Sequence, residues 1–253
     1  MNWIGLWTLT SREVGRFFKV YRQTVIPGLI SSVLYILIFG FTLEQRISSI
    51  EGISYTIFII PGLIMMNTLT NASSNPSSSL LQMKLTGQVP DLMQAPLSSL
   101  EISLAFIVGG VVRGVVNGIL ILLIGMWIGG MEVLYPIATI GFIFVVSVAF
   151  SSMGLLLGQL ADTWDQLATM QNFFLTPLSF LGGIFYSVNM LPDWAQTISA
   201  FNPIYYMING LRYTTLGFSD SDPQYSFVIA LLMSIGLSLS LIHISEPTRL
   251  PGI

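Results

Sequence analysis

Residues able to do covalent or metal chemistry are scarce in this chain of 253 residues, which has no cysteine and one histidine, His243. A Ser-His triad needs an imidazole to accept the serine proton, and structural zinc sites are built from thiolates and imidazoles. Two of the possible carboxylate pairs lie in short polar segments, Glu44 with Glu51 and Asp162 with Asp165, and we expect both pairs to be solvated. The phosphate-cradling run GxxxxGK[ST] does not occur in the sequence. We therefore predict no catalytic, cofactor-binding or metal-binding residue on this chain.

Arg113 is a charged side chain inside an apolar stretch, VVRGVV. Placing such a charge at the centre of a membrane costs about 2.5 to 3.5 kcal/mol on insertion scales. Arg113 could line a path or a dimer interface, or it could be a structural arginine that bonds a carbonyl or reaches toward the inner surface. Gly110, Gly114 and Gly118 are spaced four apart around it, which predicts a helix face that packs closely against its neighbours.

The composition places the chain in a membrane. Hydrophobic residues make up 53% of it and charged residues 8%, against about 25% charged in a typical soluble domain. The net charge of -3 is spread thinly, and no basic run suggests binding of nucleic acid. The sequence therefore predicts an all-α, polytopic membrane protein.

Six apolar stretches have the roughly 20 residues that a helix needs to cross about 30 Å of hydrocarbon. We predict spans at Thr24–Leu43, Ile53–Ala72, Ile102–Ile128, Val133–Leu157, Leu167–Val188 and Tyr225–Ile244. Residues 1–22 precede them as an amphipathic helix lying in the membrane interface, with Val14, Phe17, Phe18 and Tyr21 on one face and the basic side chains opposite. Residues 23–244 then form one six-helix transmembrane domain.

Basic residues set the expected orientation, since cytoplasmic segments carry an excess of Lys and Arg. The N-terminus has no apolar signal core or cleavage site, so we expect it to be retained and to lie in the cytoplasm. Residues 73–101 then lie inside, and residues 189–224 lie outside. The inner side holds Arg12, Arg16, Lys19, Arg22 and Lys84, against Arg46 and Arg212 outside.

The outer segment from Gly182 to Gly217 is too polar and too interrupted by proline to cross a bilayer. Pro192 opens one short helix, and Asn202-Pro203 ends it and starts a second, because the residue before a proline is pushed out of the helical region. We predict a re-entrant helical pair between the fifth and sixth spans. Its aromatic side chains, Trp194, Tyr205 and Tyr206, could anchor it at the interface or contact a substrate.

The same segment resembles the type-2 ABC transporter permeases, the membrane subunits of ATP-driven exporters. The resemblance lies in Gly182-Gly183, Leu191-Pro192, Asn202-Pro203-Ile204-Tyr205 and Leu211-Arg212, and it is nearest to the drug-export and lipo-oligosaccharide-export branch. It implies a multi-pass homodimer in the bacterial inner membrane that exports an amphipathic or lipid-linked substrate. ATP would then be bound by a separate ATPase subunit. The motif residues Pro192, Asn202, Pro203, Tyr205 and Arg212 would form an outer gate.

The resemblance also makes the inner segment and the N-terminal helix the parts that rest on the ATPase. We expect Leu81, Lys84, Leu85 and Pro96 to belong to this coupling loop, with a short amphipathic helix at residues 80–85. Membrane lipid would contact the interfacial helix.

Two other classes of function remain open from the residues alone. A secondary transporter or channel needs no ATPase, but the spans hold few carboxylates for a proton relay and show no repeat of two halves. A membrane scaffold without transport activity is also compatible with the composition. Residues 242–253 abandon the apolar pattern, and we interpret them as a non-native tail fused to the last helix.

Overall fold

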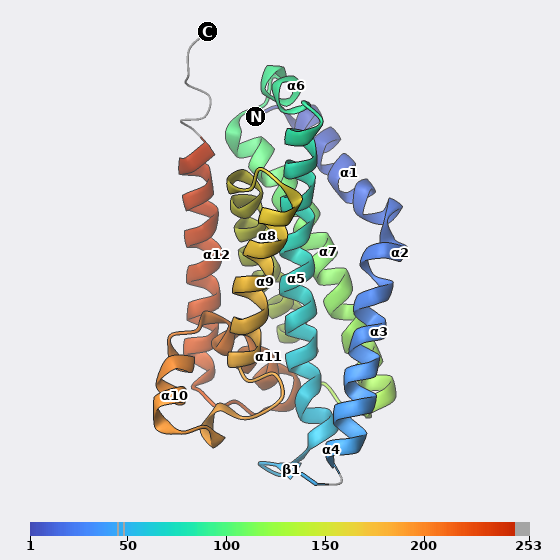
Figure 1. The fold of residues 1–253 in the computed structure, drawn as a ribbon, viewed down its shortest axis with the longest axis vertical. Coiled ribbons are helices and arrows are strands. Elements are labelled where there is room, and N and C mark those ends of the chain that lie inside the picture. Colours follow the sequence, from blue (N-terminus) through green and yellow to red (C-terminus); the bar gives the residue numbers. More distant parts are fainter. Residues whose placement is uncertain (45, 48, 246–253) are drawn as a thin grey trace.

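The computed structural model describes residues 1–44, 46–47 and 49–245, and the last part of the predicted non-native tail, 246–253, lies outside them. Helices account for nearly all of the described secondary structure, as Figure 1 shows. The helices are α1 (Trp3–Lys19), α2 (Tyr21–Thr24), α3 (Ile26–Tyr35), α4 (Thr42–Glu44), α5 (Tyr55–Leu85), α6 (Val89–Gln94), α7 (Ser99–Gly129), α8 (Pro136–Leu160), α9 (Trp164–Leu181), α10 (Asp193–Ala200), α11 (Pro203–Leu216) and α12 (Pro223–Ser245).

Short irregular elements connect some of these helices. A π-helical segment, Ile36–Phe41, joins α3 to α4, and a 3-10 turn, Val188–Met190, precedes α10. The strands β1 (Ser49–Ile50) and β2 (Ile53–Ser54) pair antiparallel, with Ser49 opposite Ser54. Glu51 and Gly52 connect them at φ values of 50° and 81°, as a tight hairpin turn of the I′ type requires.

Five helical stretches in the described residues are long and apolar enough to cross a membrane. They are Tyr21–Glu44, Tyr55–Leu85, Ser99–Gly129, Pro136–Leu160 and Pro223–Leu241, and each overlaps a predicted span. The remaining predicted span, Leu167–Val188, corresponds to α9, which ends at Leu181 and carries Asp165, Gln171 and Asn172. The sixth crossing therefore stays a prediction.

The second predicted span is wrong at its inner end, because α5 continues 13 residues past Ala72 to Leu85 and runs through Pro76. A proline inside a helix leaves the carbonyl four residues earlier without its usual donor. Serines after Pro76 bond the carbonyls nearby, Ser77 Oγ to Ser73 O at 2.8 Å and Ser78 Oγ to Ser74 O at 2.6 Å. The polar run SSNPSSS is thus part of a helix of 31 residues, about 46 Å long.

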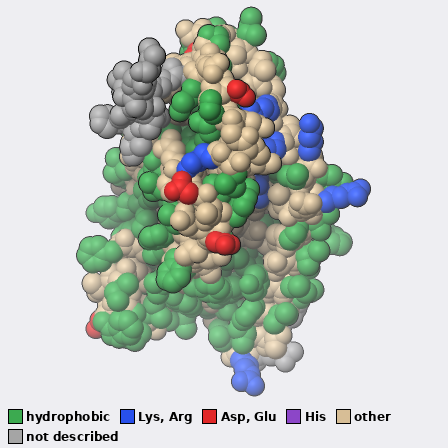
Figure 2. Space-filling model, turned by 45° about the horizontal axis from the view of Figure 1, so that its top comes forward, with side chains coloured by type: hydrophobic (Ala, Val, Ile, Leu, Met, Phe, Trp, Pro, Cys, Tyr) green, Lys and Arg blue, Asp and Glu red, His purple; other side chains and the backbone are tan. Residues whose placement is uncertain are grey.

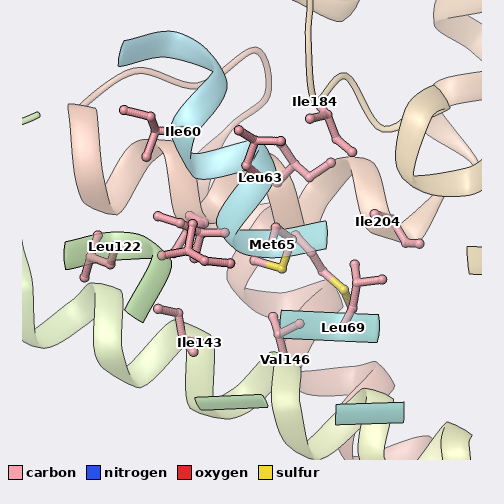
Figure 3. Packing of buried hydrophobic residues seen from close by; sticks show 14 of the residues in the cluster. Ile60, Leu63, Met65, Leu69, Leu122, Ile143, Val146, Ile184 and Ile204 are labelled. Carbon is pink, nitrogen blue, oxygen red and sulfur yellow. The ribbon is translucent and has the colours of Figure 1, made fainter. Parts of the chain in front are cut away.

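The helix α5 forms the centre of the bundle, with α7, α8, α9 and α11 around it (Figure 1). Figure 3 shows Ile60, Leu63, Met65 and Leu69 of α5 packed against apolar side chains of α7, α8 and α11. The glycine face predicted on α7 is confirmed. A Cβ at Gly110 would lie 2.7 Å from the Ala72 carbonyl, and one at Gly118 would lie 2.6 Å from Thr68 Oγ1. These glycines let α7 approach α5 closely.

Candidate functional site

The helices α10 and α11 adopt the broken arrangement expected from Pro192 and Pro203. Pro192 is the N-cap of α10, and Pro203 occupies the first turn of α11. Asn202 caps α11 by accepting a hydrogen bond from Ile204 N at 3.0 Å, and its Nδ2 donates to Leu178 O at 2.6 Å. Asn202 therefore fixes both the break and its position against α9. That the pair dips into the membrane stays a prediction.

Arg212 is the largest side chain that is fully buried in the described residues. Its Nη2 donates to the Gly183 carbonyl at 2.8 Å, its Nη1 lies 3.5 Å from Asp220 Oδ2, and its guanidinium carbon lies 4.0 Å from the centre of the Phe58 ring. A cation over an aromatic face gains further stabilisation when water is excluded. Arg212 thus ties α11 to the Gly183 carbonyl, and its part in an outer gate stays a prediction.

Asp220 is the counter-ion of Arg212. We call Arg212, Asp220, Gly183 and Ser187 the outer cluster. The Asp220 carboxylate accepts hydrogen bonds from Ser187 Oγ at 2.6 Å and from Val188 N at 3.1 Å, and its side chain has no exposed surface. The sequence analysis missed Asp220, because it lies in a polar loop where a carboxylate is normally solvated. One buried ion pair thus ties α11 to the segments before and after it.

The aromatic residues of the pair do not share one environment. Tyr205 is buried, so it cannot act as an interface anchor, whereas Trp194 and Phe201 are exposed. The Tyr206 hydroxyl donates to the Ala200 carbonyl at 3.0 Å across the break. Interface anchoring by Trp194 stays a prediction.

Arg113 belongs to a second polar arrangement, which follows one face of α5. Four α5 side chains spaced four residues apart each bond a different neighbour, and we call them the α5 ladder. From the outer to the inner end, Asn67 donates to Ser32 of α3 at 2.9 Å, and Asn71 accepts from Arg113 Nε of α7 at 3.0 Å. Further along, Asn75 accepts from Arg16 Nη2 of α1 at 3.1 Å, and Ser79 donates to Glu13 of α1 at 3.0 Å. Residues i and i+4 lie above one another on a helix, so the ladder is continuous along α5.

The inner end of the ladder fixes α1 to the bundle through Glu13, which is fully buried. The Glu13 carboxylate lies 3.5 Å from Arg12 Nη2 and 3.7 Å from Arg16 Nε. A Cβ on Gly109 of α7 would lie 2.8 Å from the Glu13 Cβ, so the glycine lets α1 pack closely against α7. Burial lowers the pKa of Arg16, and the Glu13 carboxylate acts in the opposite direction. The sequence analysis missed Glu13 and the ladder, although the spacing of Asn67, Asn71 and Asn75 was visible.

The predicted coupling residues divide into inward-facing and outward-facing side chains. Leu81 is fully buried against Ala161 and Leu167. Lys84 Nζ donates to Gln159 O at 3.0 Å and Ala161 O at 2.6 Å and pairs with Asp162 at 3.0 Å, so it caps the end of α8.

Leu85 is 52% exposed, and the Pro96 carbonyl accepts from Asn2 Nδ2 at 3.2 Å. The predicted amphipathic helix at residues 80–85 is the last part of α5 rather than a separate helix. Of the four, Leu85 and Pro96 are exposed and placed to meet another protein.

A cavity of about 280 Å³ opens between α3, α5 and α9. Polar side chains make up much of its lining, together with larger apolar ones from the same helices. The lining residues include Ser31, Tyr35, Met66, Asn67, Thr70, Thr176, Ser179 and Phe180. Asn67 thus belongs both to this cavity and to the α5 ladder.

The described residues form a helical bundle with five membrane-length helices, a polar cavity along its central helix and one fully buried arginine, and this defines a multi-pass membrane protein. The chain belongs to the ABC-2 type transporter family, whose model matches residues 5–216. It is therefore a permease subunit of an ABC transporter rather than an enzyme, and the family implies an ABC ATPase as its partner.

Curated relatives match over most of their length. The chain is 37% identical to the inner membrane transport permease YadH of Escherichia coli K12 over 239 residues, which cover 94% of this chain and 93% of the relative. It is 24% identical to nodulation protein J of Rhizobium leguminosarum bv. viciae over 220 residues, which cover 86% and 83%. It is 21% identical to nodulation protein J of Rhizobium meliloti over 217 residues, which cover 85% and 82%.

Proposed function

We propose that two copies of this chain form the membrane part of a bacterial inner-membrane ABC exporter, with a path for an amphipathic or lipid-linked substrate between them. A separate ATPase binds the ATP and drives alternating access. The observation that carries the proposal is the polar cavity between α3, α5 and α9. Polar side chains are costly in contact with lipid tails, so such a cavity is expected to face protein or water.

Exposed residues beside the cavity support a second copy on this side. Thr70 lies near the middle of α5 and is exposed. On α9, Phe173 and Phe174 are exposed and directly precede Leu175 and Thr176, which line the cavity. Mixed polar and aromatic side chains suit a substrate with a polar head and an apolar tail. The resemblance of the Asn202-Pro203 segment to exporters of drugs and lipo-oligosaccharides supports outward transport.

Disulfide crosslinking tests the proposed pairing, because the chain has no cysteine of its own. Thr70→Cys should give a crosslinked homodimer in membranes, and the yield should change when the ATPase is trapped with ATP. Phe144→Cys is the matched control, since Phe144 is 51% exposed on α8, which does not line the cavity. Crosslinking through Phe144→Cys with none through Thr70→Cys would place the interface elsewhere and contradict the proposal.

We also propose that the end carrying α1 and α6 faces the cytoplasm. Figure 2 shows blue Lys and Arg side chains gathered toward this end, over a largely green body. Cysteines at Thr86 and at Gln224, both exposed, would be probed on intact cells with an impermeant thiol reagent. Labelling should occur at Gln224→Cys and not at Thr86→Cys, and the reverse pattern would invert the topology.

A further inference from the structure

Arg113 carries a positive charge that no carboxylate of the described residues neutralises, since none of their ion pairs includes it. Its Nε donates to Asn71 Oδ1 at 3.0 Å, and within the same part of the chain its two Nη atoms donate to nothing. Neither Nη atom is among the buried side-chain atoms without a partner, so both can be reached from outside the bundle. The four N–H groups on these two atoms are therefore available to an acceptor from elsewhere.

Arg113 faces the bend between α1 and α3, residues 18–25, which we call the elbow. Gly109 of α7 packs against α1, because a Cβ there would lie 2.8 Å from the Glu13 Cβ. Arg113 follows Gly109 by one helical turn on the same face of α7, and α1 ends at Lys19. The helices α1 and α3, on either side of the elbow, both contact α7 (Figure 1). The free side of the guanidinium thus lies beside the elbow.

The side chains of the elbow are those of a membrane interface. Lys19 and Arg22 are exposed cations, and Phe18 and Tyr21 are exposed aromatic residues beside them. The elbow contains no Asp or Glu. Basic and aromatic side chains gather at the level of the lipid headgroups, where the basic ones attract anionic lipids. The elbow therefore marks the depth at which lipid phosphates lie.

The length of α7 gives the same depth for Arg113. Trp127, near the end of α7 that lies away from α1, is exposed and suits the opposite interface. About 30 Å of hydrocarbon takes about 20 residues of helix, which puts the other edge of the hydrocarbon near Ile107. Arg113 then lies about one and a half helical turns inside that edge, where a long basic side chain can extend its charged end to the headgroups.

Lipid, rather than a second copy, is the expected neighbour on this side. The cavity at which we place the second copy lies between α3, α5 and α9, and α7 contributes no residue to its lining. Val108 of α7 and Ile26 of α3 are exposed apolar side chains of the helices that meet at the elbow. Acyl chains can cover these side chains while the headgroup reaches Arg113.

We propose that Arg113 binds the phosphate of a phospholipid from the leaflet that contains α1. Two Nη atoms can donate to two phosphate oxygens at once, and Asn71 holds the guanidinium in place through Nε. Lys19 and Arg22 attract the anionic lipid to the elbow. The inference goes beyond the proposed function, because it needs neither an ATPase nor a second copy.

A headgroup series on the unaltered full chain tests the site. The delipidated protein in detergent is titrated with palmitoyl-oleoyl phosphatidylglycerol and, separately, with the diacylglycerol that has the same acyl chains, and native mass spectrometry counts the bound lipids. We expect phosphatidylglycerol to bind about tenfold more tightly or better, because only it offers charged acceptors. Excess inorganic phosphate should leave it bound, since free phosphate has no acyl chains.

Substitution of Arg113 assigns the phosphate to this residue. Arg113→Gln should weaken phosphatidylglycerol binding by about tenfold or more, and Arg113→Lys should lose less, because it keeps the charge without the planar fork. Arg46→Gln is the matched control: it removes the same charge from an exposed position between α4 and β1. This control should bind within about twofold of the wild type, because Arg46 lies far from the elbow along the chain.

Four results would overturn the inference. Equal binding of diacylglycerol and phosphatidylglycerol by the wild type would mean that acyl chains alone are recognised, and this result does not depend on the folding of a variant. Displacement by inorganic phosphate would assign Arg113 to a free anion. Normal phosphatidylglycerol binding by Arg113→Gln would place the phosphate elsewhere, and an equal loss in Arg46→Gln would reduce the effect to net charge.

Discussion

Two arginines inside the molecule, Arg212 on α11 and Arg113 near the middle of α7, are held in different ways. Arg212 is fully buried, faces the carboxylate of Asp220 and lies over the Phe58 ring. Arg113 is partly exposed, and within the described residues its side chain donates a hydrogen bond to an amide, Asn71 Oδ1. A buried charge held by an opposite charge is costly to separate, whereas an amide can exchange one donor for another.

The difference assigns different mechanical roles to the two ends. The outer cluster joins three chain segments through one ion pair, so we expect these segments to keep their relative positions. The α5 ladder joins α5 to α1, α3 and α7 through separate hydrogen bonds, and it reaches the cavity between α3, α5 and α9 through Asn67. If α1 rests on the ATPase, we expect its movement to be passed along α5 by exchange of ladder partners, while the outer cluster stays closed.

Asp220→Asn is expected to have the largest effect on stability. Removing the charge leaves Arg212 buried without a counter-ion, which typically costs about 3 to 5 kcal/mol. The thermal unfolding midpoint of the purified protein in detergent should fall by many degrees, while Asp222→Asn, at an exposed residue two positions on, should leave it unchanged. A normal midpoint for Asp220→Asn would mean that the ion pair of the outer cluster contributes no more to stability than the hydrogen bonds of the α5 ladder.

Leu81→Ala should come next, and it tests how rigid the inner end of α5 is. Leu81 is fully buried, and truncation of a buried leucine usually costs about 2 to 5 kcal/mol. Leu85→Ala, at the exposed position one turn further, should change stability by less than about 0.5 kcal/mol. The comparison uses unfolding midpoints for both variants and ATPase binding for Leu85→Ala. Equal destabilisation by the two changes would contradict the assignment of Leu81 to the core.

Arg113→Gln should destabilise less than either change above, by about 1.5 to 3 kcal/mol at most, the usual worth of a hydrogen bond to a charged group. The substitution removes the donor to Asn71 Oδ1, while Asn71 Nδ2 keeps its bond to the Asn67 carbonyl at 3.0 Å. If the ladder transmits movement, substrate-stimulated ATP hydrolysis should fall by far more than stability does. Asn117→Leu, on the same helix, is the control, since Asn117 bonds only its own helix at Arg113 O. Wild-type stimulation in Arg113→Gln would limit the ladder to packing.

The sequence predicted those features that depend on local pattern, and it missed those that depend on tertiary partners. Apolar stretches located the helices, glycine spacing located the close face of α7, and Asn202-Pro203 located the break between α10 and α11. Asp220 and Glu13 could not be recognised, because whether a carboxylate is solvated or buried against an arginine depends on which segments fold over it. The polar run after Ala72 misled the span boundary, because Ser77 and Ser78 bond carbonyls of their own helix through their hydroxyls and α5 continues to Leu85.

Pro203→Ala should have the smallest effect, and it tests what keeps the outer pair broken. From the sequence alone, removing the proline is expected to let α10 and α11 join into one helix, since the steric restriction on Asn202 disappears. The structure argues against this outcome. Pro203 lies in the first turn of α11, where a missing N–H costs nothing, and the Asn202 side chain holds the break by bonding Ile204 N and Leu178 O.

Alanine at position 203 should therefore shift stability by less than about 1 kcal/mol, whereas Asn202→Ala should cost about 0.5 to 2 kcal/mol for the lost cap and more for the lost bond to α9. Export measured in vesicles at matched expression should follow the same order, with Asn202→Ala impaired and Pro203→Ala near wild type. The opposite order would show that the proline, and not the asparagine cap, keeps the outer end rigid while the inner ladder moves.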